Sequence, residues 1–234
     1  LRVINSLDMP RLSIIIPTLN EAASINNTLA NLQTLIEDGH EIIIVDGGST
    51  DQTVSICKQY TNKVFTSDKG RAKQMNMGAK HASNEMLVFL HADTLLPIKA
   101  AQLINQALSN NHKRWGRFNI KLSGVYLSLR LVEFFMNVRS CLSGIATGDQ
   151  AIFVYRESFN SVNGFKDIPL MEDIELSRSL KKISSPACVY SPVISSSRRW
   201  ETQGVLRTIF LMWKLRLFYF FGMPASRLVK LYYR

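Results

Sequence analysis

The chain has 234 residues, of which 46% are hydrophobic and 20% are charged. This composition is typical of a globular protein and excludes a mainly disordered chain, which would lack the apolar residues that offset ordering entropy. The 28 lysines and arginines exceed the 18 acidic residues by 10, and ten of the basic residues fall between 181 and 234 beside a single acid, Glu201. A basic end on a near-neutral body predicts an anionic partner, such as nucleotide phosphates or anionic lipid.

The three cysteines lie far apart and form no C-x-x-C pair. Neither a disulfide framework nor a zinc site is therefore expected, and a reducing compartment is the default. The first ten residues contain no apolar segment of signal-peptide length. We therefore expect a cytoplasmic protein.

The first hundred residues alternate between short β-branched runs and helical periodicity. Strands are expected over 12–16, 41–45, 63–66 and 86–90, and helices over 20–37, 54–60, 70–81 and 97–109. Thr18 with Glu21 has the spacing of a capping box, and Ser49 with Gln52 offers a second cap. Continuous apolar strands one β-α-β unit apart predict a doubly wound α/β domain with a mostly parallel, Rossmann-like sheet.

Further along the chain the pattern is mixed. Strands are expected over 117–122, 151–155 and 189–194, the last an edge strand because it contains Pro192. Helices are expected over 122–138 and 172–182. The first of these helices carries Arg130, Glu133 and Asn137 on one polar face.

Residues 205–223 form a strongly apolar, aromatic-rich segment. Arg207, Lys214 and Arg216 interrupt it, which makes spanning a bilayer unfavourable, and Arg216 lies on the opposite side from the other two. A short basic helix should follow over 225–234, giving the pattern of an interfacial membrane anchor. The alternatives are packing on its own domain or in a homodimer. We expect one domain over 11–202 and a helical appendage over 203–234.

Three segments together resemble a known family: PTLNE at 17–21, DGGSTD at 46–51 and HADT at 91–94. In this order, on successive strand ends, they resemble the nucleotide-sugar half of a family 2 inverting glycosyltransferase with the GT-A fold. The segment GRAKQMNMGA at 70–79 is similar to a bacterial branch called "transferase 2", which is associated with radical-SAM and selenium-related genes.

The resemblance implies a nucleotide-diphosphate sugar as the donor. It would be bound by Pro17, Thr18, Asn20, Glu21, Asp46, Gly47, Arg71, Gln74, Ala92, Asp93, Arg198 and Arg199. For Thr18 and Glu21 the alternative is helix capping, for Gly47 a simple turn, and for Arg71 an exposed surface position.

A departing diphosphate develops negative charge, which a divalent cation or basic groups would stabilise. Asp93 follows a buried strand and can hold Mg²⁺ or Mn²⁺, or it can cap the helix before Pro97. The family usually has an acid where this chain has His91. Neutral imidazole suits Mn²⁺ better than Mg²⁺, and the alternative is that His91 only shapes the pocket.

The resemblance also implies an acceptor site. Its residues would be Gly148, Asp149, Gln150, Glu172 and Trp200, with Asp173 as the catalytic base that takes the proton of the attacking hydroxyl. The alternative for Glu172 and Asp173 is that both are simply first-turn helix charges. For Arg198 and Arg199 the alternative is surface charge continuous with the basic tail.

The expected activity is metal-assisted, inverting transfer of a hexose to a hydroxyl, on a lipid carrier or on another molecule. A nucleotidyltransferase is the first alternative, but residues 17–21 are acidic and lack the glycines of a triphosphate-binding loop. The second is a non-catalytic binder of membranes or nucleic acid. Nucleic acid is not expected as a partner, since the aromatic residues of the tail lie within a continuous apolar helix. Anionic lipid would place the protein on the inner face of the cell membrane.

Overall fold

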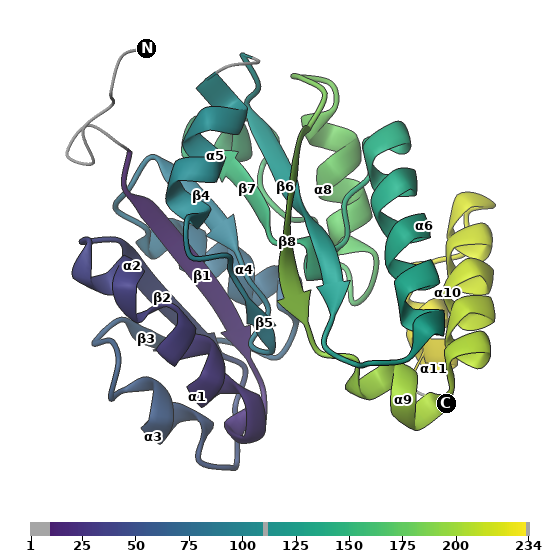
Figure 1. Ribbon diagram of the computed structural model, residues 1–234, viewed down its shortest axis with the longest axis horizontal. Helices are drawn as coiled ribbons and strands as arrows, with labels where there is room; N and C mark the ends of the chain where they lie inside the picture. Colours follow the sequence, from purple (N-terminus) through teal and green to yellow (C-terminus); the bar gives the residue numbers. More distant parts are fainter. Residues whose placement is uncertain (1–9, 110–111, 233–234) are drawn as a thin grey trace.

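The computed structural model describes residues 10–109 and 112–232 (Figure 1). The expectation that no signal peptide is present falls on the first nine residues, which lie outside the described residues, as does Arg234 of the basic tail. The strands are β1 (Leu12–Thr18), β2 (Glu41–Asp46), β3 (Val64–Thr66), β4 (Met86–Phe89), β5 (Thr94–Leu95), β6 (Trp115–Leu122), β7 (Ile152–Tyr155) and β8 (Ala187–Ser195).

Helices cover both faces of the sheet (Figure 1). They are α1 (Ala22–Asn31), α2 (Gln33–Glu37), α3 (Thr53–Cys57), α4 (Arg71–His81), α5 (Ala100–Ser109), α6 (Leu127–Ser143), α7 (Arg156–Ser161), α8 (Glu172–Leu180), α9 (Arg198–Gln203), α10 (Val205–Phe220) and α11 (Ala225–Tyr232), with a 3₁₀ turn η2 (Gly148–Gln150). Within the described parts of the chain, no helix is both long enough and apolar enough to cross a membrane.

The eight strands form one sheet in the order β3-β2-β1-β4-β7-β6-β8-β5. Strands β1 to β4 pair in parallel, β7 runs antiparallel to both β4 and β6, and β8 runs parallel to β6. The predicted mostly parallel α/β sheet is confirmed. The carboxyl ends of β1, β2, β4, β6 and β8 therefore meet at one edge, together with the amino end of β7.

Alternate residues of the buried strands pack on opposite faces. Ile14 and Ile16 of β1 join the core beneath α1 and α5. Ile15, between them, packs with Met75 of α4 and with Phe89 on the other face. Continuous apolar runs in β1, β2 and β4 follow from this arrangement, because both faces of these strands are covered.

The helix predicted over 20–37 is divided at Leu32 into α1 and α2. Both predicted caps are wrong, because neither Glu21 before α1 nor Gln52 before α3 makes a side-chain capping bond. Thr18 belongs to β1. Ser49 instead donates hydrogen bonds to Asp46, at the end of β2. These polar side chains are used to join loops rather than to start helices.

The strand predicted over 189–194 is β8, which lies between β6 and β5. β5 pairs with it only at Ile194 and Ser195, so among the described residues the stretch with Pro192 has no strand partner on that side, as expected for an edge. The register of β8 with β6 shifts where Phe118 pairs with Val189 but Asn119 pairs with Pro192. An irregularity of this kind accommodates a proline inside a sheet, because the ring carries no N–H to donate.

The polar face of α6 packs inward. β7 pairs only with Trp115 and Gly116, so the later part of β6 lacks a strand on that side. The side chain of Asn137 supplies the missing partner: its Oδ1 accepts from Ile120 N at 2.8 Å and its Nδ2 donates to Ile120 O at 3.0 Å. Arg130 Nη2 donates to the carbonyl of Leu122 at 2.7 Å. The backbone groups of β6 are thus satisfied, and the apolar side of α6 faces outward.

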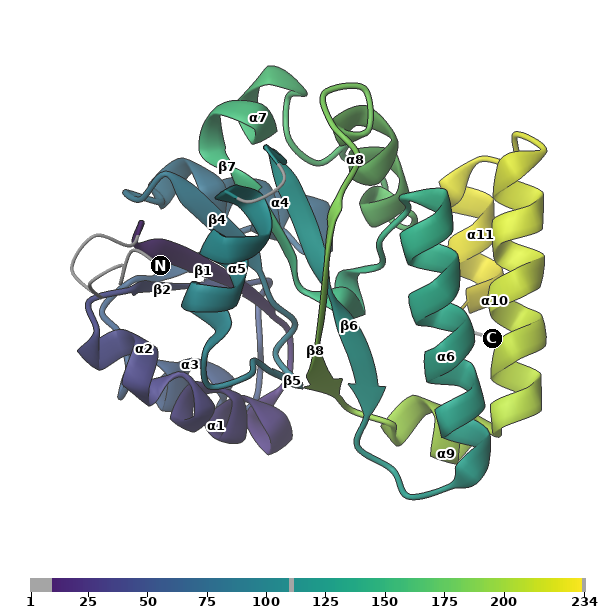
Figure 2. The same ribbon diagram turned by 45° about the horizontal axis from the view of Figure 1, so that its top comes forward.

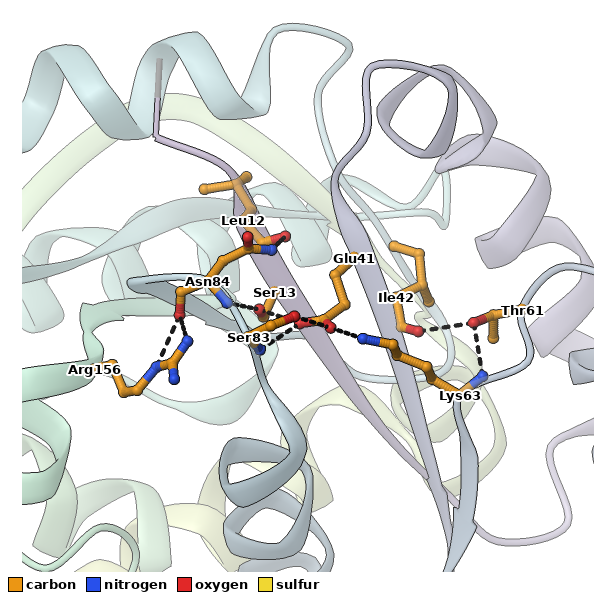
Figure 3. Close-up of polar contacts among 9 residues, drawn as sticks. All are labelled: Leu12, Ser13, Glu41, Ile42, Thr61, Lys63, Ser83, Asn84 and Arg156. Atoms are coloured by element: carbon orange, nitrogen blue, oxygen red, sulfur yellow. Dashed lines mark hydrogen bonds and ion pairs between the residues drawn. The ribbon is translucent and has the colours of Figure 1, made fainter. Parts of the chain in front are cut away.

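A polar network closes the opposite edge of the sheet (Figure 3). Glu41, at the start of β2, accepts hydrogen bonds from Ser13, Ser83 and Lys63. Burial opposes ionisation of this carboxyl, but the bonds from Lys63, Ser13 and Ser83 outweigh it and lower the pKa of Glu41 to about 2. The network ties β1, β2 and β3 together, far from the edge where the strand ends meet.

Candidate functional site

A cavity of about 640 Å³ lies at the edge of the sheet where the carboxyl ends of the strands meet. Pro17 of β1, Leu122 of β6, Ser195 of β8 and the segment after β4 form one side of it. The start of α8 and residues of α9 to α11 form the other side. Topology therefore brings side chains far apart in sequence to one site, as expected for an open α/β sheet.

Thirteen of the residues predicted from the sequence line this cavity. They are Pro17, Glu21, Arg71, His91, Ala92, Asp93, Gly148, Asp149, Glu172, Asp173, Arg198, Arg199 and Trp200. The remaining six lie outside the lining: Thr18, Asn20, Asp46, Gly47, Gln74 and Gln150.

Asp46 is 3% exposed, and its carboxylate holds the loop that follows β2. Its Oδ2 accepts hydrogen bonds from the backbone N–H groups of Gly48 at 2.9 Å and Ser49 at 2.8 Å. Its Oδ1 accepts a bond from Thr18 Oγ1 at 3.1 Å. Asp46 and Thr18 thereby shape the loop that follows β2; their role in binding the donor stays a prediction.

Gln74 braces the ends of β1 and β2. Its Nε2 donates to the carbonyl oxygens of Thr18 and Val45, both at 2.8 Å. A Cβ at Gly47 would lie 3.2 Å from the Gln74 amide, so the glycine permits this close approach. Asn20, with a φ of 55°, accepts a bond from Thr50 N at 2.8 Å. These residues fix the loops that follow β1 and β2, of which the first carries Glu21 in the cavity lining.

Gln150 is buried and organises the η2 turn. Its Oε1 accepts from Thr147 N at 3.1 Å, and its Nε2 donates to Ser140 Oγ at 2.9 Å. This pairing holds the turn against α6, so that Gly148 and Asp149 face the cavity while Gln150 points away from it.

His91 and Asp149 form a pair within the cavity, with Nδ1 and Oδ1 3.0 Å apart. Burial alone would lower the pKa of His91, but the bond to Asp149 outweighs it and raises that pKa. Burial would raise the pKa of Asp149, and the bond from His91 lowers it. The pairing therefore stabilises the charged form of both side chains.

The acidic pair at the start of α8 occupies two environments. Asp173 faces the cavity, where its Oδ2 accepts a hydrogen bond from Gly148 N at 3.0 Å. Glu172 is 6% exposed, and burial together with the charge of Asp173 raises its pKa. The backbone of the η2 turn thus holds the carboxylate predicted to be the base.

A divalent cation would depend mainly on Asp93. In the parts of the chain that the structure describes, no three His, Cys, Asp or Glu side chains are grouped to hold a metal. His91 uses Nδ1 for Asp149, and its Nε2 lies against Gly148, 2.4 Å from where a Cβ would be. Asp93 lines the cavity. A single carboxylate fits a cation that takes its other ligands from substrate phosphates and water.

Basic side chains line the same cavity. Arg198 Nη2 lies 3.7 Å from a carboxylate oxygen of Glu21. Arg199 stacks over the ring of Tyr232 with 3.7 Å between its guanidinium carbon and the ring centre. Arg216 of α10 also lines the cavity and was not predicted as a site residue. The signal was available, since Arg216 lies opposite the other two cations of an otherwise apolar segment.

The comparisons with known proteins agree with this geometry. Residues 13–159 match the family model described as Glycosyl transferase family 2. Validoxylamine A glucosyltransferase of Streptomyces hygroscopicus subsp. jinggangensis (strain 5008) is 38% identical over 96 residues, which cover 37% of this chain and 23% of that protein. The chain thus spans about a quarter of the length of this curated relative.

Two solved structures have a similar fold. Staphylococcus aureus TarS (residues 1–349), in complex with UDP-GlcNAc, has a TM-score of 0.63 at 19% identity, covering 80% of this chain and 58% of that one. The mannosyltransferase PcManGT from Pyrobaculum calidifontis, in complex with GDP-Man and Mn²⁺, has a TM-score of 0.58 at 24% identity. The match covers 82% of this chain and 57% of that one. With the family match extending over more than half of its length, the chain belongs to glycosyl transferase family 2 and has a GT-A-like fold.

Proposed function

We propose that the chain transfers a hexose from a nucleotide-diphosphate sugar to a hydroxyl acceptor, with inversion at the anomeric carbon. The observation that carries this proposal is one cavity in which Asp93 and Asp173 are gathered with Arg71 and Arg199. Carboxylates can hold a cation and accept a proton, and one guanidinium group can bind two phosphate oxygens at once. The structures solved with UDP-GlcNAc and GDP-Man support the choice of donor class.

Asp93 is the residue that would hold Mn²⁺ or Mg²⁺. A bound cation would neutralise the charge that develops on the departing diphosphate. Arg71 and Arg199 would bind phosphate oxygens on the same side of the cavity. The loops braced by Asp46 and Gln74 would shape the site for the base and ribose. The resemblance of residues 70–79 supports membership of the "transferase 2" branch.

Asp173 would take the proton from the acceptor hydroxyl as that oxygen attacks C1 of the sugar opposite the diphosphate. Its hydrogen bond from Gly148 N fixes one carboxylate oxygen. Glu172 would position Asp173 through the start of α8. Asp149, held by His91, and Trp200 line the part of the cavity that we assign to the acceptor.

A panel of UDP-, GDP-, dTDP- and CDP-sugars, each with and without Mn²⁺, tests the donor assignment by thermal shift. A ligand that binds only the folded state raises its stability by RT ln(1 + [L]/Kd). We expect one base to raise the melting temperature, with a larger rise in the presence of Mn²⁺, and we expect Asp93→Asn to remove the metal-dependent part. No shift with any of the four donors would contradict the proposal.

We also propose that the molecule binds the anionic inner surface of the cell membrane. Helices α6 and α10 lie side by side on one flank (Figures 1 and 2). Their exposed apolar residues form what we call the apolar flank: Leu131, Phe134, Phe135, Val138 and Leu142 of α6 with Leu206, Phe210, Trp213, Leu217 and Phe220 of α10. Exposed cations on α10 and α11 accompany them: Arg207, Lys214, Arg227 and Lys230. Apolar and basic residues together match an anionic bilayer surface.

Cosedimentation with vesicles tests this membrane proposal. We expect binding to vesicles that contain phosphatidylglycerol, weakened by salt, and little binding to phosphatidylcholine vesicles. A Phe210→Ser, Trp213→Ser variant should lose binding. The control Ile98→Ser changes a residue that is 84% exposed but lies outside the apolar flank, and should keep binding. A stable dimer that buries the flank and ignores vesicles would contradict the proposal.

A further inference from the structure

Arg216 is a cation in the cavity wall for which the protein provides no direct partner. The other cations of α10, Arg207 and Lys214, are exposed, whereas Arg216 is half-buried and lines the cavity. Within residues 10–109 and 112–232, no hydrogen bond joins the Arg216 guanidinium to another group, and no carboxylate oxygen lies within 4 Å of it. A guanidinium offers five N–H donors, so this group is available to a ligand.

A second guanidinium stands close to the first. Arg139 of α6 has its Nη2 buried without a hydrogen-bond partner among the described residues. Burial, and then the like charge of Arg216, lower the pKa of Arg139 to about 10. Two neighbouring cations that are partly removed from water destabilise the fold unless an anion compensates them. α6 and α10 thus bring together two cations that no carboxylate contacts directly among the described residues, although the charge of Asp173 acts on both of them.

The position of Arg216 points to the acceptor rather than the donor. The acids close enough to act on its charge are Asp173 and Asp149, both on the side assigned to the acceptor. Leu215, beside Arg216, packs with Met171 and Ile174 at the start of α8, which carries Asp173. An anion on Arg216 would therefore lie on the side of the cavity that holds the proposed catalytic base.

We propose that Arg216, supported by Arg139, is a phosphate-binding subsite for the acceptor. On the proposed function, on which this inference rests, the acceptor carries a phosphate group near the hydroxyl that Asp173 deprotonates. The planar fork of Arg216, which lines the cavity, matches the oxygens of a phosphate, and Arg139, which is not in the lining, would add its charge to the attraction for a doubly charged anion. The subsite would exclude neutral sugars and polyols, since these leave both cations uncompensated.

Binding of glycerol 3-phosphate to the full chain tests this subsite. UDP and Mn²⁺ are first added at saturation, which fills the diphosphate site, and calorimetry then measures glycerol 3-phosphate and glycerol at constant ionic strength. We expect glycerol 3-phosphate to bind and glycerol not to bind. Arg216→Gln should weaken glycerol 3-phosphate binding by at least about tenfold. Arg216→Lys, which keeps the charge but loses the fork, should weaken it less.

Arg207→Gln is the matched control, because it removes the same charge from an exposed position on the same helix. It should leave the binding of glycerol 3-phosphate unchanged. The affinity for UDP, measured in every variant, reports separately on folding and on the donor site. Unchanged glycerol 3-phosphate binding in Arg216→Gln, or equal binding of glycerol, would overturn the subsite. If wild-type protein bound glycerol 3-phosphate but not UDP, the donor assignment would fail while the subsite remained.

Dodecyl phosphate below its micellar concentration distinguishes two sources of the phosphate. Tighter binding of dodecyl phosphate than of glycerol 3-phosphate, lost in Arg216→Gln, would support the subsite with a lipid-linked acceptor. The reverse order, with the same loss, would support it with a water-soluble acceptor. Binding of either compound that ignores the Arg216→Gln change would contradict the subsite.

Discussion

The Nδ1 atom of His91 lies 3.0 Å from the Oδ1 atom of Asp149, and this contact joins the end of β4 to the turn before β7. The next link is Gly148, whose backbone N–H donates to Asp173 at 3.0 Å. A continuous set of contacts therefore runs from the strand end that carries Asp93 to the proposed base. A change at its centre should affect both sides of the cavity.

Gly148→Ala tests this set of contacts. A Cβ at this position would lie 2.4 Å from His91 Nε2, so the ring must move and the bond to Asp149 must weaken. We expect a loss of stability of about 1 to 3 kcal/mol and a large loss of transfer activity. Thermal unfolding and transfer assays measure the two effects.

The variant that combines His91→Ala with Gly148→Ala provides the control. Removing the ring relieves the steric conflict, so the cost of Gly148→Ala should be much smaller in that background. A cost of the same size with and without the ring would show that the conflict is not with His91.

Asp173→Asn should reduce transfer by at least about a hundredfold while the affinity for donor stays within twofold. The amide cannot accept the proton of the attacking hydroxyl, but it keeps the size of the side chain. Glu175→Gln, on the same helix but outside the cavity lining, is the matched control and should retain activity. Full activity of Asp173→Asn would contradict the assignment of the base, and Glu172→Gln would then be assayed as the alternative.

Glu172 should reduce stability when it ionises. Burial and the charge of Asp173 raise its pKa in the folded state. A raised pKa means that folding favours the protonated form of Glu172. The stability gained from this form is complete below the unfolded-state pKa and is lost as pH rises through the folded-state pKa. Glu172→Gln should therefore be more stable than the wild type at pH 8, by about 1 kcal/mol, with a smaller difference at pH 4. Urea denaturation at both pH values measures this; a variant less stable at pH 8 would oppose it.

Glu41 should show the opposite pH dependence. Its pKa in the folded state is lowered to about 2, so its stabilising effect is complete above the unfolded-state pKa and is lost as pH falls toward 2. Glu41→Gln should cost about 2 kcal/mol of unfolding free energy at pH 7, and this cost should shrink between about pH 4.5 and pH 2. The exposed control Glu37→Gln should have little effect at any pH. A cost for Glu41→Gln that does not change with pH would exclude this source of stability.

Much of the first half of the fold could be predicted because local signals and packing agree there. The runs in β1, β2 and β4 are apolar at consecutive positions, and both faces of these strands are buried. Parallel strands place their carboxyl ends together, so the polar residues at the strand ends could be assigned to one edge from sequence alone: Thr18, Asn20, Asp46, His91 and Asp93. The structure places His91 and Asp93 in the cavity lining, whereas Thr18, Asn20 and Asp46 lie outside it.

Other features depended on tertiary contacts without a local signature. The polar face of α6 packs inward because part of β6 lacks a strand partner on that side. The sequence of residues 127–143 alone does not show that side chains must supply those hydrogen bonds. Asp46 ends β2 and Gln74 lies in α4, yet the side chains of both hold backbone groups behind the cavity wall. Arg216 did carry a local signal, because it lies opposite the other two cations of its segment. Its entry into the cavity nevertheless depends on a tertiary contact: α10 folds back onto the start of α8, where Leu215 packs with Met171 and Ile174.

A crystal structure with a nucleotide-diphosphate sugar and manganese would test the central claim most directly. We predict that the diphosphate lies between Asp93 and the cavity arginines, with manganese on the Asp93 carboxylate. Asp173 should face C1 of the sugar from the side opposite the diphosphate. An empty cavity with the donor bound in another cleft, or a diphosphate held away from Asp93, would contradict the assignment of this cavity as the transfer site.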